Sequence, residues 1–120
     1  MLQSVRGITI NYEVQGEGAP MLLVHGLGTH LGVWRYQAPV LRDTHKLVLC
    51  DLRGFGASTV APPPYSFAEW ADDLAALLSS LHVDKVLFVG HSMGACIGLR
   101  FALDHPDRCA GLVLIGGFSE

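Results

Sequence analysis

Short runs of apolar residues recur along the chain, separated by segments with the spacing of amphipathic helices. The runs occupy residues 21–24, 47–50, 86–89 and 112–115. Their hydrophobicity is continuous rather than alternating, which is typical of strands covered on both faces. Strands that alternate with helices through right-handed crossovers predict an α/β fold, with a mostly parallel sheet and helices on both faces.

Residues 8–14 have a different pattern, because apolar and polar side chains alternate there. This period of two predicts a half-exposed antiparallel edge strand, for which residues 2–5 offer a pairing partner.

The clearest helix is predicted to begin after Ser66, whose side chain can cap it, with Glu69 completing a capping box. Its apolar positions between residues 67 and 81 fall on one face, while Asp72 and Asp73 fall on the other. A second helix is expected from Ser92 to the His-Pro pair at 105–106. It has almost no polar face, which predicts a central, buried helix.

Length and composition indicate one compact unit, since half of the 120 residues are hydrophobic. The net charge is -3, and the lysines and arginines are scattered, so the sequence argues against nucleic acid and membrane surfaces as partners. The N-terminus lacks the apolar core of a signal peptide, which makes a cytoplasmic location the default expectation. The prolines at 62–64 predict a stiff surface loop.

The three cysteines, Cys50, Cys96 and Cys109, lie in apolar stretches and are widely spaced. Cysteine packs there as a small hydrophobic residue, so all three are predicted to be buried thiols. None has a histidine or cysteine at ligand spacing, so no metal site is expected.

The residues Gly90-His91-Ser92-Met93-Gly94 stand between a predicted strand and a predicted helix. A serine at such a sharp turn projects its hydroxyl out of the sheet, while Gly90 and Gly94 let the two backbones approach closely. This context predicts a nucleophile. The competing interpretation is that Ser92 only caps its helix.

Two further motifs follow predicted strands: His25-Gly26-Leu27-Gly28, and the Asp-x-Arg-Gly-x-Gly-x-Ser segment at 51–58. With the serine motif, they occur in the order found in the α/β-hydrolase family, which this chain resembles over its whole length. The resemblance covers only the family's N-terminal half. It implies that residues 1–120 are the N-terminal portion of a single α/β-hydrolase domain whose C-terminal strands are absent.

By this resemblance Ser92 is the nucleophile, and the backbone N–H groups of Leu27 and Met93 form the oxyanion hole. The N-terminus of the helix after Ser92 supports this independently, because it presents unpaired N–H groups and a positive dipole end. Gly26 is expected to support the site. Trp34 is a candidate for lining an acyl pocket, although an aromatic residue is as often ordinary core.

Three other polar residues near these motifs are predicted to be structural. His25 is expected to hydrogen-bond nearby loop backbone rather than act as a base. Asp51 is expected to belong, with Gly54 and Gly56, to a turn held by side-chain to backbone hydrogen bonds. The alternative is that Asp51 and Arg53 pair as a catalytic acid and its orienter. His91 is expected to point away from the Ser92 site.

The family's catalytic acid and histidine follow the serine in the chain, and neither is recognisable here. His105 lies thirteen helical positions after Ser92, roughly 20 Å away at 1.5 Å per residue, too far for proton transfer. Glu120 has no histidine to orient. The expectation is therefore a part of a longer hydrolase that is nearly inactive alone and can self-associate through its exposed sheet edge.

The predicted function is acyl transfer from a small ester, lactone or thioester to Ser92, without metal or cofactor. The run of motifs resembles the enol-lactonase and carboxylesterase branch, and a serine rather than an aspartate points away from dehalogenases and epoxide hydrolases. One alternative is a non-catalytic binding module with the same fold. Another is a dinucleotide-binding oxidoreductase, suggested by Gly26-x-Gly28 and Asp51, although Leu31 replaces the third glycine.

Overall fold

The computed structural model describes residues 1–60, 62 and 65–116, so the predicted loop prolines at 63 and 64 and Glu120 lie outside the described residues. The elements in chain order are β1 (Leu2–Val5), β2 (Ile8–Gln15), β3 (Ala19–Val24), η1 (Leu31–Trp34), α1 (Ala38–Leu41), β4 (His45–Cys50), α2 (Phe67–Ser80), β5 (Val86–His91), α3 (Met93–Asp104), η2 (Pro106–Arg108) and β6 (Cys109–Ile115).

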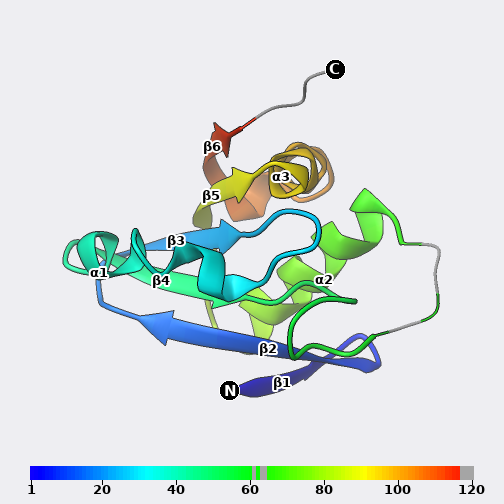
Figure 1. Cartoon of the computed structure of the whole chain (residues 1–120). Coiled ribbons are helices and arrows are strands. Elements are labelled where there is room, and N and C mark those ends of the chain that lie inside the picture. Colours follow the sequence, from blue (N-terminus) through cyan, green and yellow to red (C-terminus); the bar gives the residue numbers. More distant parts are fainter. Residues whose placement is uncertain (61, 63–64, 117–120) are drawn as a thin grey trace.

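The strands form one mixed sheet in the order β1-β2-β4-β3-β5-β6 (Figure 1). Strands β4, β3, β5 and β6 are mutually parallel, and β1 and β2 are antiparallel to their neighbours. This confirms the predicted fold class and each of the four apolar runs as strands. The prediction that residues 8–14 form the edge is wrong, because β2 pairs with both β1 and β4 and the edge is β1.

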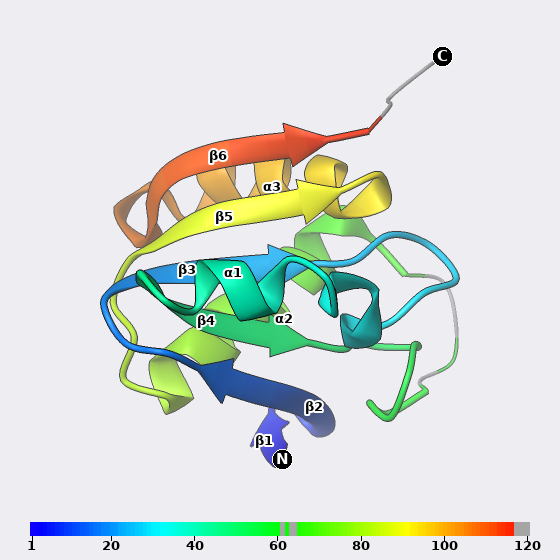
Figure 2. The same ribbon diagram turned by 60° about the vertical axis from the view of Figure 1, so that its left-hand side comes forward.

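Helices cover both faces of the sheet, as predicted: α2 and α3 lie on one face, and η1 and α1 on the other (Figure 2). Each face has its own apolar core. The larger core, under α2 and α3, includes Leu22, Phe88 and Phe101. The smaller core, under η1 and α1, includes Leu23 and Trp34. Adjacent residues of β3 thus face opposite cores, which explains the continuous hydrophobicity of this strand.

Helix α2 begins as predicted, because the Ser66 hydroxyl accepts a hydrogen bond from the Glu69 N–H at 3.1 Å. The prediction that Asp73 lies on the polar face of this helix is wrong, however. Asp73 is only 2% exposed and pairs with the Arg53 guanidinium, with Nε–Oδ2 at 2.8 Å. Arg6 reaches the same carboxylate at 2.7 Å. A tertiary ion pair therefore overrides the helical pattern.

Helix α3 is less buried than predicted. Ile97 and Phe101 are buried, but Leu99 is half-exposed and Leu103 is 78% exposed. The thiols also differ from expectation: Cys50 is buried, whereas Cys96 and Cys109 are only partly buried. Burial raises the pKa of the Cys50 thiol to about 12, so it is an inert core thiol.

Because these strands are parallel, the carboxyl ends of β3, β4 and β5 lie at the same end of the sheet (Figure 2). The loops that begin at His25, Asp51 and Ser92 therefore start side by side, although they are far apart in the sequence. Among the helices of the described segments, none has the length and apolar character needed to cross a membrane.

Strand β6 pairs with β5 on one side only among the described residues, and Val113, Leu114 and Ile115 on it are partly exposed. The strand carries no charged side chain from 109 to 115. Natural sheet edges usually carry charges or prolines that prevent pairing with another chain.

We therefore expect this chain to self-associate through β6, and Val113→Lys to shift it toward monomer, because a lysine opposes strand pairing. Light scattering coupled to size exclusion would report the mass. Val40→Lys, at an equally apolar exposed position on α1, is the matched control. Equal masses for the wild-type chain and Val113→Lys would contradict the expectation.

Candidate active site

Ser92 occupies a sharp turn between β5 and α3. Its φ of 58° and ψ of -117° lie in a region that a residue with a side chain rarely adopts. The Ser92 N–H donates to the Ile115 carbonyl at 2.9 Å, and the Ser92 carbonyl accepts from the Ala95 N–H at 2.9 Å. These bonds, one to β6 and one to α3, hold the strained backbone in place.

Glycines at 90 and 94 permit this turn, as the sequence predicted. A Cβ placed on Gly94 would lie 2.8 Å from the His25 carbonyl oxygen and closer still to that of Val24. A Cβ on Gly90 would lie 2.8 Å from the Ala95 nitrogen. Helix α3 thus approaches both β5 and the end of β3 with no room for a methyl group.

The Ser92 side chain does not cap α3 and makes no hydrogen bond to its first turn. The competing helix-cap interpretation is therefore wrong. The residue as a whole is only partly buried. A serine held in a strained turn without a structural hydrogen bond to its helix is suited to nucleophilic attack.

The loop after β3 passes beside this serine. A Cβ on Gly26 would lie 3.1 Å from the Ser92 Cβ, so the two residues are in close proximity. Within the described residues, the N–H groups of Leu27 and Met93 have no hydrogen-bond acceptor. Met93 is the first residue of α3, where helix N–H groups lack intrahelical partners. Two N–H groups without a recorded acceptor thus lie in the Ser92 turn and in the loop that passes it, and their role as oxyanion donors stays a prediction.

His25 is fully buried and uses both ring nitrogens for loop backbone, as predicted. Its Nε2 accepts from the Leu52 N–H at 2.9 Å, so Nδ1 carries the proton and donates to the Gly26 carbonyl at 2.8 Å. Burial is the main cause that lowers the pKa of His25. The ring is thus a neutral link between the loops after β3 and β4.

Asp51 is the second such link. Its Oδ1 accepts from the Leu31 N–H at 2.7 Å, and its Oδ2 accepts from the Ala57 N–H at 2.9 Å and from Asn11 Nδ2 at 3.0 Å. Burial opposes ionisation, but these donors outweigh it and lower the pKa of the Asp51 carboxyl. The predicted turn-holding role is confirmed.

Among the described residues, the Arg53 guanidinium does not pair with Asp51, so the alternative of a catalytic acid and its orienter is wrong. Arg53 pairs with Asp73 of α2, and hydrogen bonding to that carboxylate raises the pKa of the guanidinium. The pattern gave no signal for this pair, because Asp73 occupies a helix position that spacing alone assigns to solvent.

Trp34 is 4% exposed and packs in the smaller core. It also borders a cavity of about 220 Å³ that is further lined by Val33, Gln37, His91 and Ile115. The Trp34 Nε1 and His91 Nδ1 atoms are buried without a partner among the described residues. His91 thus faces the η1 side of the sheet.

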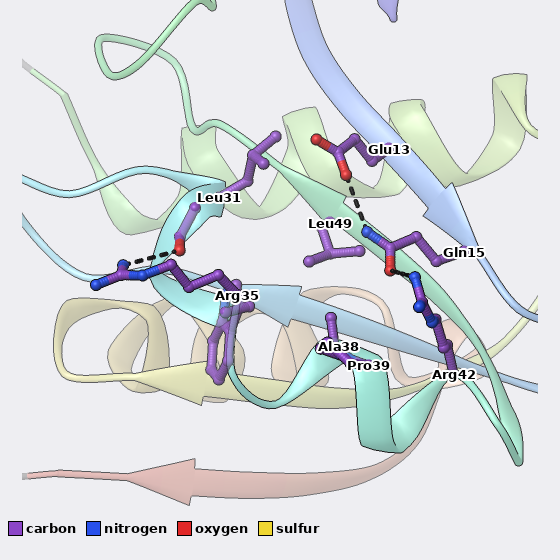
Figure 3. Close-up of a pocket in the computed structure, with 10 residues that line it drawn as sticks. Glu13, Gln15, Leu31, Arg35, Ala38, Pro39, Arg42 and Leu49 are labelled. Carbon is purple, nitrogen blue, oxygen red and sulfur yellow. Dashed lines mark hydrogen bonds between the residues drawn. The ribbon is translucent and has the colours of Figure 1, made fainter.

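A second cavity, of about 260 Å³, lies between β2, η1 and α1. Figure 3 shows the residues that line it. Charged and amide groups border it, with Gln15 Nε2 donating to Glu13 at 2.9 Å and Arg42 donating to Gln15 at 3.4 Å. Ser92 is not among its lining residues, so we assign it no part in the site.

The remaining candidate base is far from the site. His105 ends α3, at the opposite end from Ser92, where its Nε2 lies 2.8 Å from Asp72 Oδ1. Sequence reasoning also missed Thr29, whose hydroxyl donates to the Gly26 carbonyl at 2.9 Å. Its only signal was its place three residues after Gly26, which suits a turn-closing hydrogen bond.

Comparison with known proteins agrees with this geometry. The model of the alpha/beta hydrolase fold family matches residues 19–120. A fluoroacetate dehalogenase of Burkholderia sp is 39% identical over 119 residues, covering 95% of this chain and 39% of the relative. The putative carbamate hydrolase RutD of Azorhizobium caulinodans is 36% identical over 109 residues, covering 91% and 41%.

Among solved structures, that of Est816, an N-acyl homoserine lactone degrading enzyme, matches with a TM-score of 0.91 at 36% identity, covering 95% of this chain and 44% of that one. The chain therefore belongs to the α/β hydrolase fold family, and the resemblance drawn from its motifs is confirmed. It spans 39% to 41% of the length of the two curated relatives, which are named as hydrolases with different substrates.

The structure opposes the dinucleotide alternative. Gly28 is followed by the short 3-10 helix η1, not by a long helix whose N-terminus could hold a pyrophosphate. The Asp51 carboxylate, which would have to bind a ribose, is occupied by Leu31, Ala57 and Asn11.

Gly94→Ala should destabilise the protein by about 1–3 kcal/mol, because the new methyl group meets fixed backbone of β3. The sign is diagnostic, since this change stabilises an ordinary helix by about 1 kcal/mol. Urea unfolding would measure it. Gly111→Ala, whose Cβ would meet only the flexible end of Leu87 at 3.2 Å, is the control. A stabilised Gly94→Ala variant would contradict the close approach.

The free energy of unfolding should fall as pH drops below about 6.5, because the unfolded chain then protonates His25 and the folded one does not. Asp51, with its lowered pKa, adds a further loss below about pH 4. Unfolding at pH 7.5 and 5.5 should therefore show a smaller pH dependence for His25→Gln than for the wild type. Equal dependence would contradict the buried, neutral histidine.

Proposed function

We propose that the protein is a serine hydrolase that transfers the acyl group of a small ester, lactone or thioester to Ser92. The observation that carries this proposal is the strained backbone of Ser92, whose hydroxyl does not cap α3. The N–H groups of Met93, next in the chain, and of Leu27, in the adjacent loop, have no recorded acceptor among the described residues. Strain of this kind persists where function requires it.

In the proposed reaction the Ser92 Oγ attacks the acyl carbon while a base takes its proton. The carbonyl oxygen becomes negative and is bound by the N–H groups of Leu27 and Met93, each supplying about 3 kcal/mol of transition-state stabilisation. Collapse expels the alcohol or thiol with a proton, and water then releases the acid and regenerates Ser92.

In this proposal, neither His25 nor His105 is the base. Both nitrogens of His25 are bound to loop backbone, and His105 lies at the far end of α3. The proposal therefore assigns the acid and the histidine of the triad to residues outside these 120, in keeping with the greater length of the relatives. By itself this chain should turn over slowly.

A serine nucleophile favours acyl substrates over halides. Displacement of a halide by Ser92 would form an ether, which water does not cleave readily, whereas acyl transfer forms an ester that it does. The name of the dehalogenase relative therefore does not extend to this chain. The lactone-degrading enzyme Est816 and the putative carbamate hydrolase are named for acyl substrates, which supports this substrate class.

Trp34 is proposed to border the pocket for part of the substrate. Ser92 does not line the cavity that Trp34 shares with His91. The support for the proposal is that two of its lining residues adjoin the Ser92 turn, since His91 precedes the serine and the Ile115 carbonyl accepts from the Ser92 N–H. Trp34 Nε1 and His91 Nδ1 are buried there without a partner among the described residues, so each can hydrogen-bond a polar group of a ligand or a water molecule.

Ser92→Ala should abolish covalent labelling by a fluorophosphonate and, in a form that contains the base, lower kcat for p-nitrophenyl acetate by up to about 10⁶-fold. Mass spectrometry of the labelled peptide locates the adduct. Ser4→Ala, an exposed serine on β1, is the control and should label normally. Equal turnover by wild type and Ser92→Ala would instead support a non-catalytic binding module.

A further inference from the structure

The Gly26 carbonyl oxygen is held by three donors. His25 Nδ1 donates to it at 2.8 Å, the Thr29 hydroxyl at 2.9 Å and the Thr29 N–H at 3.3 Å. A carbonyl oxygen has two lone pairs, and the two short bonds, from the His25 ring and the Thr29 hydroxyl, account for both, while the Thr29 N–H bond is the longest of the three. The Thr29 N–H bond closes a four-residue turn, in which Gly28 has a φ of 76°.

This carbonyl and the Leu27 N–H belong to the same peptide unit. A trans peptide is planar, and its C=O and N–H point in opposite directions. Whatever fixes the Gly26 carbonyl therefore fixes the direction of the Leu27 N–H. The Leu27 side chain is 70% exposed, so packing does not hold the residue.

The ends of the loop are anchored independently of this peptide. The His25 ring accepts from the Leu52 N–H at one end, and Asp51 accepts from the Leu31 N–H at the other. Between these anchors, the Thr29 hydroxyl and the His25 ring make the side-chain hydrogen bonds recorded for the described residues 26–29, and both bonds are to the Gly26 carbonyl. Loss of the hydroxyl would leave only the ring and the longer Thr29 N–H bond on that carbonyl, which loosens the central peptide without releasing the loop ends.

We propose that Thr29 is a positioning residue whose hydroxyl, together with the His25 ring, aims the Leu27 N–H at the reacting oxygen. This inference rests on the proposed function, in which that N–H binds the oxyanion. Thr29 itself does not contact the substrate; it acts through the shared peptide.

The expected effect is on the transition state and not on substrate binding. Thr29→Val keeps the shape of the side chain but removes the hydroxyl donor, leaving two donors on the Gly26 carbonyl. We expect kcat to fall about 10-fold, less than the 10²–10³-fold cost of deleting an oxyanion donor. KM should stay within about twofold, because ground-state binding does not use this N–H.

The test compares Thr29→Val, Thr29→Ser and Thr44→Val in p-nitrophenyl acetate hydrolysis by the protein with its base present. Thr44 is exposed at the start of β4 and hydrogen-bonds only locally, so it is the matched control. Thr29→Ser and Thr44→Val should retain wild-type kcat. A wild-type kcat for Thr29→Val, or a proportional rise in its KM, would overturn the inference.

A crystal structure of Thr29→Val provides a readout that needs no activity. It should show the Gly26–Leu27 peptide rotated, with residues 25 and 31 in place; an unrotated peptide would overturn the inference. Ser92→Ala separates the two proposals. If it leaves turnover unchanged, the hydrolase proposal fails and the role of Thr29 fails with it. If it abolishes turnover while Thr29→Val keeps the wild-type kcat and an unrotated peptide, only the inference about Thr29 fails.

Discussion

The close approach of α3 to the ends of β5 and β3 is the constraint on which the candidate site depends. It is possible because positions 90 and 94 carry no side chain, and it forces Ser92 into a φ of 58°. The same approach places the first N–H of α3 and the loop after β3 around one hydroxyl. In the proposed mechanism, backbone geometry therefore places the nucleophile and its electrostatic partners before any substrate arrives.

Two buried polar side chains hold the loops beside the candidate site in place. His25 and Asp51 each accept an N–H from a neighbouring loop, so the segments after β3 and β4 form one hydrogen-bonded unit. The ion pair of Arg53 with Asp73 then ties the second loop to α2. Because these groups are buried, breaking one partner would leave another unsatisfied, which keeps the loops in a single arrangement.

Sequence alone predicted the features that depend on local chemistry. The Ser66 cap, the apolar strands, and the glycines around Ser92 follow from spacing within a few residues. The prediction from sequence failed where a residue far away in the chain determines whether a side chain is buried. Asp73 is buried because Arg53 and Arg6 meet it there, and Leu103 is exposed although its helix reads as apolar throughout. Thr29 was missed because a hydroxyl-to-carbonyl bond three residues back leaves no distinctive pattern.

The most direct test of the account is a crystal structure of the protein after reaction with a fluorophosphonate, whose phosphoryl oxygen imitates the oxyanion. The account predicts a covalent bond to the Ser92 Oγ, with that oxygen about 3 Å from the nitrogens of Leu27 and Met93. An adduct on another residue, or a phosphoryl oxygen directed away from both nitrogens, would contradict it.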